Sequence, residues 1–389
     1  MDVHLTLWPW LILVIVYGAC IGSFLNVVIY RLPAGKSLWQ PPSHCPNCEK
    51  KLAWHDNVPV LAWFYLRGRC RHCRTPISLQ YPLVEAVTAL LFAGLFATYY
   101  ISDLRPGFSN EGLGQTWPVL IVHLALGAAL LAATVVDARL FIIPMDIPNF
   151  VTVLALIALP LTVAWFPDTE GASPHIDGLW LAATAGGLIG LGLALLMLWR
   201  RVLPRSFDEQ DESEGASDDD SHGIPAQWLA HPHPRREILK ECLYVLWPLA
   251  GAIVGYLLAS QAGWGGALTN LPLPVHVAGG VLWGYMVGAA AIWATRILGT
   301  LGFGKEAMGL GDVHLLASIG AVLGWRDAVV VFFIAPFAGL MGAVVVAGLG
   351  RLAKGEGRVI PYGPYLAAAV FLWVVFQGPL KQMFAMLYR

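Results

Sequence analysis

The sequence predicts an all-α protein, a polytopic integral membrane helix bundle that carries one small cytoplasmic four-cysteine zinc loop. Three observations support this fold class. The 389 residues are 57% hydrophobic and only 13% charged, whereas roughly a quarter of the residues in soluble domains are charged. Several segments are apolar over the ~20 residues that a helix needs to cross a bilayer. Between two of these segments stand two closely spaced cysteine pairs.

Nine segments have the length and apolarity of membrane spans. They cover approximately residues 8–30, 82–101, 117–136, 144–166, 179–199, 243–262, 276–298, 327–349 and 363–380. A tenth apolar segment, residues 313–325, is short and crosses only if it is extended or if the membrane thins locally. The first span is longer than the core of a signal peptide and no Lys or Arg precedes it, so we expect it to be retained.

The distribution of Lys and Arg orients these spans, because cytoplasmic loops carry the excess of basic residues. Eight basic residues lie in residues 31–81, whereas residues 102–116 hold one and residues 167–178 hold none. The first loop is therefore placed in the cytoplasm, and alternation places residues 200–242 and 350–362 there as well. The net charge of −1 excludes a basic nucleic-acid binder, and membrane lipid is the expected surrounding.

The first cytoplasmic loop contains Cys45-x2-Cys48 and, after a gap of 21 residues, Cys70-x2-Cys73. Two CxxC pairs supply four thiolates to one tetrahedral Zn²⁺, and the spacing is close to that of zinc sites. The alternative, a disulfide framework, rarely persists in a reducing compartment. Four thiolates leave no open position for a substrate. The predicted zinc is therefore structural and folds a loop too short to build its own core.

One segment is strongly acidic. Residues 206–222, SFDEQDESEGASDDDSH, hold eight acidic and almost no apolar side chains, so we expect a disordered linker. The predicted organisation is a first span at 1–31, the zinc loop at 32–81, a membrane bundle at 82–199, the acidic cytoplasmic linker at 200–242 and a second bundle at 243–389.

Two carboxylates stand at cytoplasmic ends of predicted helices, Asp137 at the end of the third span and Asp312 in MGLGDVHLL. An ionisable group at membrane depth is costly and suggests function, although a helix cap or a packing role is the alternative for either one alone. Two carboxyls within hydrogen-bond reach share a proton, so one can act as general base on water while the other protonates the scissile carbonyl. Gly309 and Gly311 let an extended substrate backbone approach Asp312 closely.

Six stretches, in this order along most of the chain, resemble the type IV prepilin leader peptidases, which are membrane aspartic proteases of the GxGD type. They are GSFLNVVIYRLP, the CxxC pairs around WHDNVPVLAWFYLRGR, YPLVEAVTALLF, the Asp137 stretch, GKEAMGLGDVHLLASIGAVLGW and IPYGPYLAAA. The resemblance implies that Asp137 and Asp312 are catalytic. It also implies cleavage of the basic leader from type IV prepilins or type II secretion pseudopilins, at the cytoplasmic face of the bacterial inner membrane.

Family members with the cysteine loop commonly also methylate the new N-terminal amine, so the resemblance implies S-adenosylmethionine as a second cofactor. Composition and spacing give no independent sign of this activity. No glycine-rich loop after a strand is visible, so we expect no Rossmann-type methyltransferase.

The chain departs from the family pattern at three places. His314 replaces the usual Lys two residues after the second aspartate, which is expected to alter the pH dependence because His titrates near neutrality. PMD replaces PD, which shifts Asp146 by one residue and leaves its role open. Residues 200–275 look like an insertion.

Two other functions remain open. A presenilin-like or signal-peptide-peptidase-like GxGD protease would cut within helices, although the cytoplasmic four-cysteine loop argues against it. A noncatalytic membrane scaffold or transporter would use the aspartates to bind cations. Replacement of each aspartate by Asn separates a scaffold from a peptidase.

Overall fold

Apolar helices form almost every regular element of the protein, as its composition predicts. The computed structural model describes residues 3–102, 104–105, 108, 111–204, 206, 234–348 and 361–387. Within these ranges there is no strand, and the helices are α1 Val3–Arg31, η1 Trp54–Asn57, α2 Leu61–Tyr65, α3 Gln80–Tyr100, α5 Leu113–Leu140, α6 Asp146–Trp165, η2 Pro167–Ala172, α7 Gly178–Trp199, α8 Pro234–Gln261, α9 Gly265–Thr269, α10 Leu273–Phe303, α11 Leu310–Leu323, α12 Trp325–Gly348 and α13 Gly363–Leu387. The all-α prediction is confirmed. Most of the predicted acidic linker, residues 207–233, lies outside the described residues.

Nine helices among the described residues are long and apolar enough to cross a membrane. They correspond one to one with the nine predicted spans, so the polytopic architecture is confirmed. The largest difference is at α8, which begins at Pro234, nine residues before the predicted start. These extra residues carry the charged sequence RREILKE, which lowers the hydropathy of the segment but is compatible with a helix.

The tenth predicted segment forms α11, a helix of 14 residues. Its length of about 21 Å is less than the ~30 Å of a typical hydrocarbon core. It begins at Leu310, three residues before the predicted start, and therefore includes Asp312 in its first turn.

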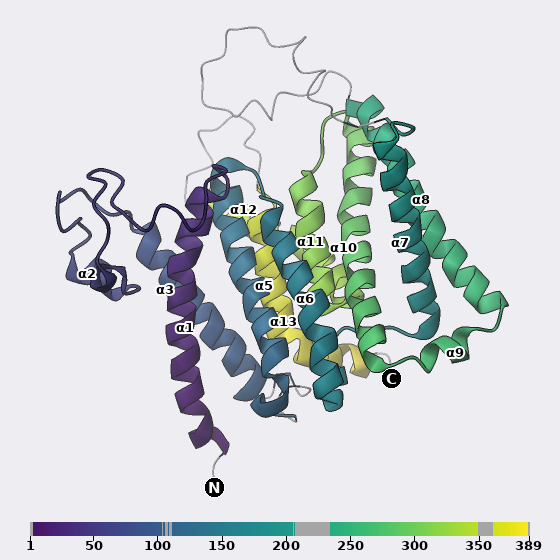
Figure 1. Ribbon diagram of the computed structural model, residues 1–389, viewed down its shortest axis with the longest axis horizontal. Coiled ribbons are helices and arrows are strands. Elements are labelled where there is room, and N and C mark those ends of the chain that lie inside the picture. Colours follow the sequence, from purple (N-terminus) through teal and green to yellow (C-terminus); the bar gives the residue numbers. More distant parts are fainter. Residues whose placement is uncertain are drawn as a thin grey trace. The chain divides into compact units, whose positions relative to one another are not determined.

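The chain divides into two compact units, the first formed by Met1–Val151 with Phe333–Arg389 and the second by Thr152–Phe332. In the first unit α1 packs on α3, and α5 packs on α1, α3 and α13, as the neighbouring ribbons in Figure 1 show. Both α3 and α5 bury apolar side chains completely, among them Phe96 of α3 and Val122 of α5. The five-part organisation predicted from the sequence stays a prediction.

In the second unit α7 packs on α8 and α9, and α10 packs on α7, α8 and α11. Two glycines of α10 allow its backbone to touch that of α11. A Cβ at Gly284 would lie 2.0 Å from the carbonyl oxygen of Gly320, and a Cβ at Gly288 would lie 2.5 Å from that of Leu316. Small residues spaced by four bring membrane helices this close. The helix that carries Asp312 is therefore seated on α10 by direct backbone contact.

The α10–α11 contact predicts unequal effects for two alanine substitutions on the same helix. Gly284→Ala places its methyl group against a backbone carbonyl, which cannot move without shifting α11, so we expect a loss of roughly 1–3 kcal/mol of stability. Gly302→Ala has no atom within 4 Å of the new Cβ, so stability should be unchanged or slightly raised. Thermal unfolding of both variants in the same detergent measures the difference, and equal melting temperatures would contradict the contact.

Candidate functional site

The four cysteines of the loop come together in the structure. The Sγ atoms of Cys45, Cys48, Cys70 and Cys73 all lie within 4.8 Å of one another, and those of Cys45 and Cys73 are 3.7 Å apart. In a tetrahedral site with metal–sulfur bonds of about 2.3 Å, neighbouring sulfur atoms stand about 3.8 Å apart. The donor set and its spacing are therefore compatible with one metal ion held by four thiolates.

The two CxxC segments adopt the same turn. In each, the amide of the first cysteine donates to the carbonyl oxygen five residues later, at 3.0 Å in the first segment and 2.9 Å in the second. Glu49 and Arg74, at equivalent positions, have left-handed φ values of 57° and 61°. Hydrogen bonds from the side chain and backbone amide of Thr75 lower the pKa of the Cys73 thiol to about 5.

Asp137 lies three residues before the end of α5 and is only 6% exposed. The C-terminal end of a helix is its negative end, so the macrodipole disfavours a carboxylate there. The backbone N–H of Gly363, the first residue of α13, donates to Asp137 Oδ2 at 2.9 Å. The positive end of α13 thus compensates for the negative end of α5. A Cβ at position 363 would lie 2.8 Å from the same oxygen, so any other residue there would displace the carboxyl group from its present position.

Asp312 is the third residue of α11, whose N-cap is Gly309. An acidic side chain in the first turn of a helix is favoured by the macrodipole. The structural alternative for Asp312, a residue that stabilises the helix end, therefore fits this position. Gly309 has an ordinary φ of −74°, and a Cβ there would lie 3.5 Å from Asp312 Oδ2, an ordinary contact. The fold therefore does not require a glycine at position 309, and a side chain there would stand against the carboxyl group.

The other residues singled out from the sequence have separate surroundings. Asp146 is the first residue of α6 and is exposed, a common place for an acidic residue. His314 Nδ1 lies 2.6 Å from the hydroxyl oxygen of Tyr285 on α10. Asp137 belongs to the first unit and Asp312 to the second.

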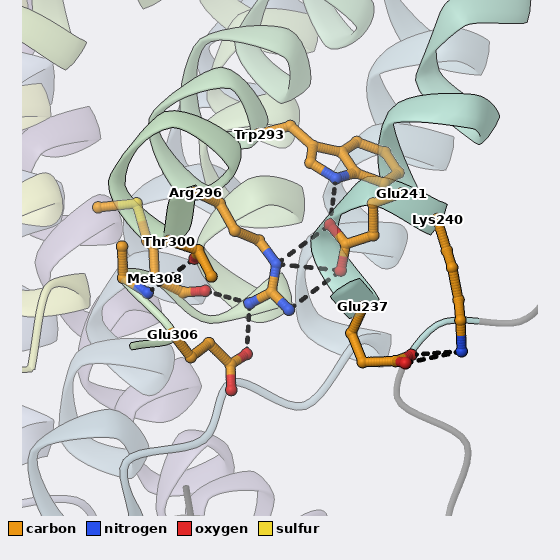
Figure 2. A network of polar contacts seen from close by, with 9 residues as sticks. Glu237, Lys240, Glu241, Trp293, Arg296, Thr300, Glu306 and Met308 are labelled. Atoms are coloured by element: carbon orange, nitrogen blue, oxygen red, sulfur yellow. Dashed lines mark hydrogen bonds and ion pairs between the residues drawn. The ribbon is translucent and has the colours of Figure 1, made fainter. Parts of the chain in front are cut away.

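A buried arginine that the sequence reasoning did not single out lies in the second unit. Arg296 of α10 is 1% exposed, and its Nε and Nη2 donate to the carboxylate of Glu241 on α8 at 3.1 to 3.3 Å. Trp293 Nε1 donates to the same carboxylate at 2.7 Å, as Figure 2 shows. An arginine inside a predicted span is by itself a signal of function. A search for long apolar segments does not detect it, because one charged residue hardly lowers the mean hydropathy of a span.

The same arginine also holds the segment that leads into α11. In Figure 2 its Nη1 points away from α8 and donates to the carboxylate of Glu306 and to the backbone carbonyl of Met308. Met308 directly precedes Gly309 and lies four residues before Asp312. Arg296 thus connects α8 to the start of the helix that carries the second candidate aspartate.

Comparison with known proteins gives two matches to family models. The bacterial peptidase A24 N-terminal domain matches residues 16–99, and the type IV leader peptidase family matches residues 242–344. Proteins named prepilin leader peptidase/N-methyltransferase are similar to the chain. One from Myxococcus xanthus is 32% identical over 66% of this chain and 65% of the relative. One from Aeromonas hydrophila is 29% identical over 94% of this chain and 92% of the relative.

The chain belongs to the type IV leader peptidase family. A further relative with the same name, from Pectobacterium carotovorum, is 26% identical over 93% of this chain and 92% of the relative. No solved structure matches the chain. The family and the enzyme class expected from the sequence, a peptidase, are confirmed. The four cysteines and Asp312 lie within the matched residues of this leader peptidase, and Asp137 lies between the two matched regions.

The Arg296 contacts predict that stability and peptidase activity respond differently to two changes. Arg296→Met removes the cation from the buried Glu241 carboxylate, which keeps the Trp293 indole donor, and this uncompensated charge should lower stability by about 3–5 kcal/mol. Adding Glu241→Met removes that charge, so stability should largely recover. The Met308 carbonyl has still lost its arginine donor, so the cleavage rate should stay low in the double variant.

Thermal unfolding and the rate of leader cleavage, measured on the same preparations, test this difference. Glu306→Gln is the matched control, because the Glu306 side chain is 47% exposed and its charge is screened by solvent. Full recovery of the cleavage rate together with stability in the double variant would show that Arg296 does not hold the segment before α11.

Proposed function

We propose that the chain is an aspartic endopeptidase that cleaves the basic leader peptide from type IV prepilins or type II secretion pseudopilins at the cytoplasmic membrane face. The names of its relatives support prepilin substrates. The observation that carries the catalytic assignment is the setting of Asp137. A buried carboxyl group stands at the end of a helix that disfavours it, and the amide of a glycine 226 positions away in the sequence donates a hydrogen bond to it.

In the proposed mechanism Asp137 and Asp312 act as a coupled pair that shares one proton. The ionised carboxyl takes a proton from the attacking water, and the protonated one donates to the carbonyl oxygen of the scissile peptide. The Gly363 amide fixes the orientation of the Asp137 carboxyl group. The absence of a side chain at Gly309 leaves room for an extended substrate backbone beside Asp312.

The site is proposed to face the cytoplasm of a bacterium, within a multi-pass protein of the inner membrane. The nine apolar helices support a multi-pass protein. The orientation is supported by the excess of Lys and Arg in residues 31–81 and their scarcity in residues 102–116 and 167–178. A leader peptide that is itself basic remains in the cytoplasm for the same reason.

We assign the cysteine cluster to a structural zinc ion. Cys45, Cys48, Cys70 and Cys73 would hold it, and the spacing of their sulfur atoms fits tetrahedral coordination. When bound, the ion would supply folding energy to the loop and no reaction chemistry, because four thiolates complete its coordination.

The relatives' names pair the peptidase with an N-methyltransferase, and we propose that this chain likewise methylates the new N-terminal amine. S-adenosylmethionine would be the methyl donor. The described residues contain no strand followed by a glycine-rich loop, so a Rossmann-type site is not part of this proposal. Mass spectrometry of the cleaved product with and without the donor tests it, because methylation adds one methylene unit to the peptide mass.

The main prediction concerns the aspartates. Asp137→Asn and Asp312→Asn should each slow cleavage about 10²–10⁴-fold, since each carboxyl supplies one half of the acid–base pair. The double variant should be no slower than either single variant, as expected of residues that act as a unit. Cleavage of a prepilin-like substrate with a basic leader, in membranes that contain equal amounts of each variant, measures these rates.

Asp146→Asn is the matched control, because Asp146 is an exposed carboxylate at the start of a neighbouring helix. Its effect should be much smaller. Normal cleavage by Asp312→Asn together with an inactive Asp146→Asn would show that the assigned pair is wrong. Normal cleavage by all single variants would favour a scaffold or transporter. A preference for substrates cut inside a helix would favour the presenilin-like alternative.

The zinc assignment predicts about one equivalent of metal per chain. Cys45→Ser removes one of four thiolates and should lose most of that metal. Cys20→Ser is the control, since Cys20 is an exposed thiol of α1 outside the cluster. Elemental analysis of purified protein measures both. Retention of a full equivalent by Cys45→Ser would reject the assignment.

A further inference from the structure

The short helix α2 of the cysteine loop presents an exposed apolar face. Leu61, Phe64 and Tyr65 lie on one side of this helix, because residues three and four apart share a face. Their exposed fractions are 68%, 63% and 75%. Ala62, on the other side, is buried. We call Leu61, Phe64 and Tyr65 the α2 face.

A hydrogen bond fixes α2 at the level of the first turns of a membrane helix. The backbone N–H of Val60, the N-cap of α2, donates to Glu85 Oε2 of α3 at 2.7 Å. Glu85 lies five residues after Gln80, the first residue of α3, which is about 7.5 Å along the helix. The headgroup layer is about 5–8 Å thick on each side of the hydrocarbon core. With the first residue of α3 at the outer surface of the headgroup layer, the α2 face lies within that layer.

The conformation of Val60 indicates that this attachment is specific. Its φ is 61°, a left-handed value that is unusual for a β-branched residue. The Glu85 side chain is 8% exposed and holds the turn in this conformation from within α3. In Figure 1 α2 accordingly lies beside the upper part of α3 and does not extend beyond the upper end of α1.

A second part of the loop also turns back toward the membrane helices. The Trp39 ring lies 6.2 Å from the ring of Phe24, measured between centroids. Phe24 is seven residues before Arg31, the last residue of α1, which is about 10 Å along the helix. Trp39 itself is 80% exposed. The loop thus places aromatic side chains from two of its segments, Trp39 and the α2 face, beside the cytoplasmic ends of α1 and α3.

The charge of the loop indicates which surface it meets. Residues 32–79 contain seven basic and two acidic side chains, and they remain net positive when four thiolates and a divalent ion are counted. The cytoplasmic leaflet carries anionic lipids that attract basic segments. Aromatic side chains with Lys and Arg around them are typical of the membrane interface.

We propose that the α2 face sits in the anionic headgroup layer of the membrane and anchors the cysteine loop there as a short interfacial helix. The depth set by Glu85 and the exposed apolar side chains favour lipid over a protein partner. The preference for anionic lipid rests on the proposed cytoplasmic orientation of the loop. The contact with lipid does not depend on peptidase activity. The crosslinking test can therefore fail while the proposed peptidase function holds, and the peptidase function can fail while the crosslinking result holds.

Photo-crosslinking of the full chain in lipid nanodiscs tests the proposal. Phe64→p-benzoylphenylalanine places a photoreactive ring on the α2 face. Trp63→p-benzoylphenylalanine is the matched control on the adjacent residue, because the Trp63 indole N–H donates to the Ile77 carbonyl at 3.1 Å and points into the loop. The metal content of each variant shows whether the loop has folded. Mass spectrometry identifies the crosslinked partner.

We expect phospholipid adducts at position 64 and peptide adducts within the loop at position 63. Adducts between position 64 and this chain, or between position 64 and a prepilin substrate, would overturn the proposal. The absence of any adduct at position 64, in an experiment where position 63 reacts, would overturn it as well. Nanodiscs of phosphatidylglycerol should give about twofold or more of the lipid adduct found with phosphatidylcholine, because the loop is basic. Equal yields would reject the anionic headgroup as the partner.

Discussion

A carboxyl group buried in a protein that is surrounded by lipid needs a partner, because water is not available to solvate it. Each buried carboxyl described above receives that partner from another part of the chain. Asp137 of α5 accepts from the Gly363 amide of α13, and Glu241 of α8 accepts from Arg296 of α10. Glu85 of α3 accepts from the cysteine loop. These bonds determine which segments are held together at the helix ends, where the candidate site residues lie.

This constraint works together with close helix packing. The Asp137 contact joins residues 226 positions apart in the sequence, and a side chain at position 363 would crowd the carboxyl oxygen that accepts it. In the second unit, Gly284 allows α10 to meet the backbone of α11. Arg296 of the same helix then holds the segment that leads into α11. Packing sets the position of each helix, and the hydrogen bond sets the conformation of the residues at its end.

The features predicted correctly from the sequence are those that depend on local composition. Apolar length gave nine spans, and cysteine spacing gave a cluster whose members approach within metal-binding distance. The predicted positions of the helix ends were less accurate. At α8, for example, the charged first turns lower the hydropathy of the segment without disfavouring a helix. The partners of Asp137 and Glu241 could not be predicted, since they depend on which faces of distant helices meet. The presence of Arg296 within an apolar segment was the available signal.

The cysteine loop shows why a metal and a membrane would be needed in the same segment. Glu49 and Arg74 occupy equivalent left-handed positions in the two CxxC turns, where glycine would be the least strained residue. The loop also exposes Trp54 and the α2 face, so it buries little apolar surface of its own to offset that strain. Coordination by four thiolates would supply the missing free energy within the loop. The lipid interface would cover the apolar side chains that the loop leaves exposed. The metal would thus offset the backbone strain of the loop, and the membrane would offset its lack of a buried apolar core.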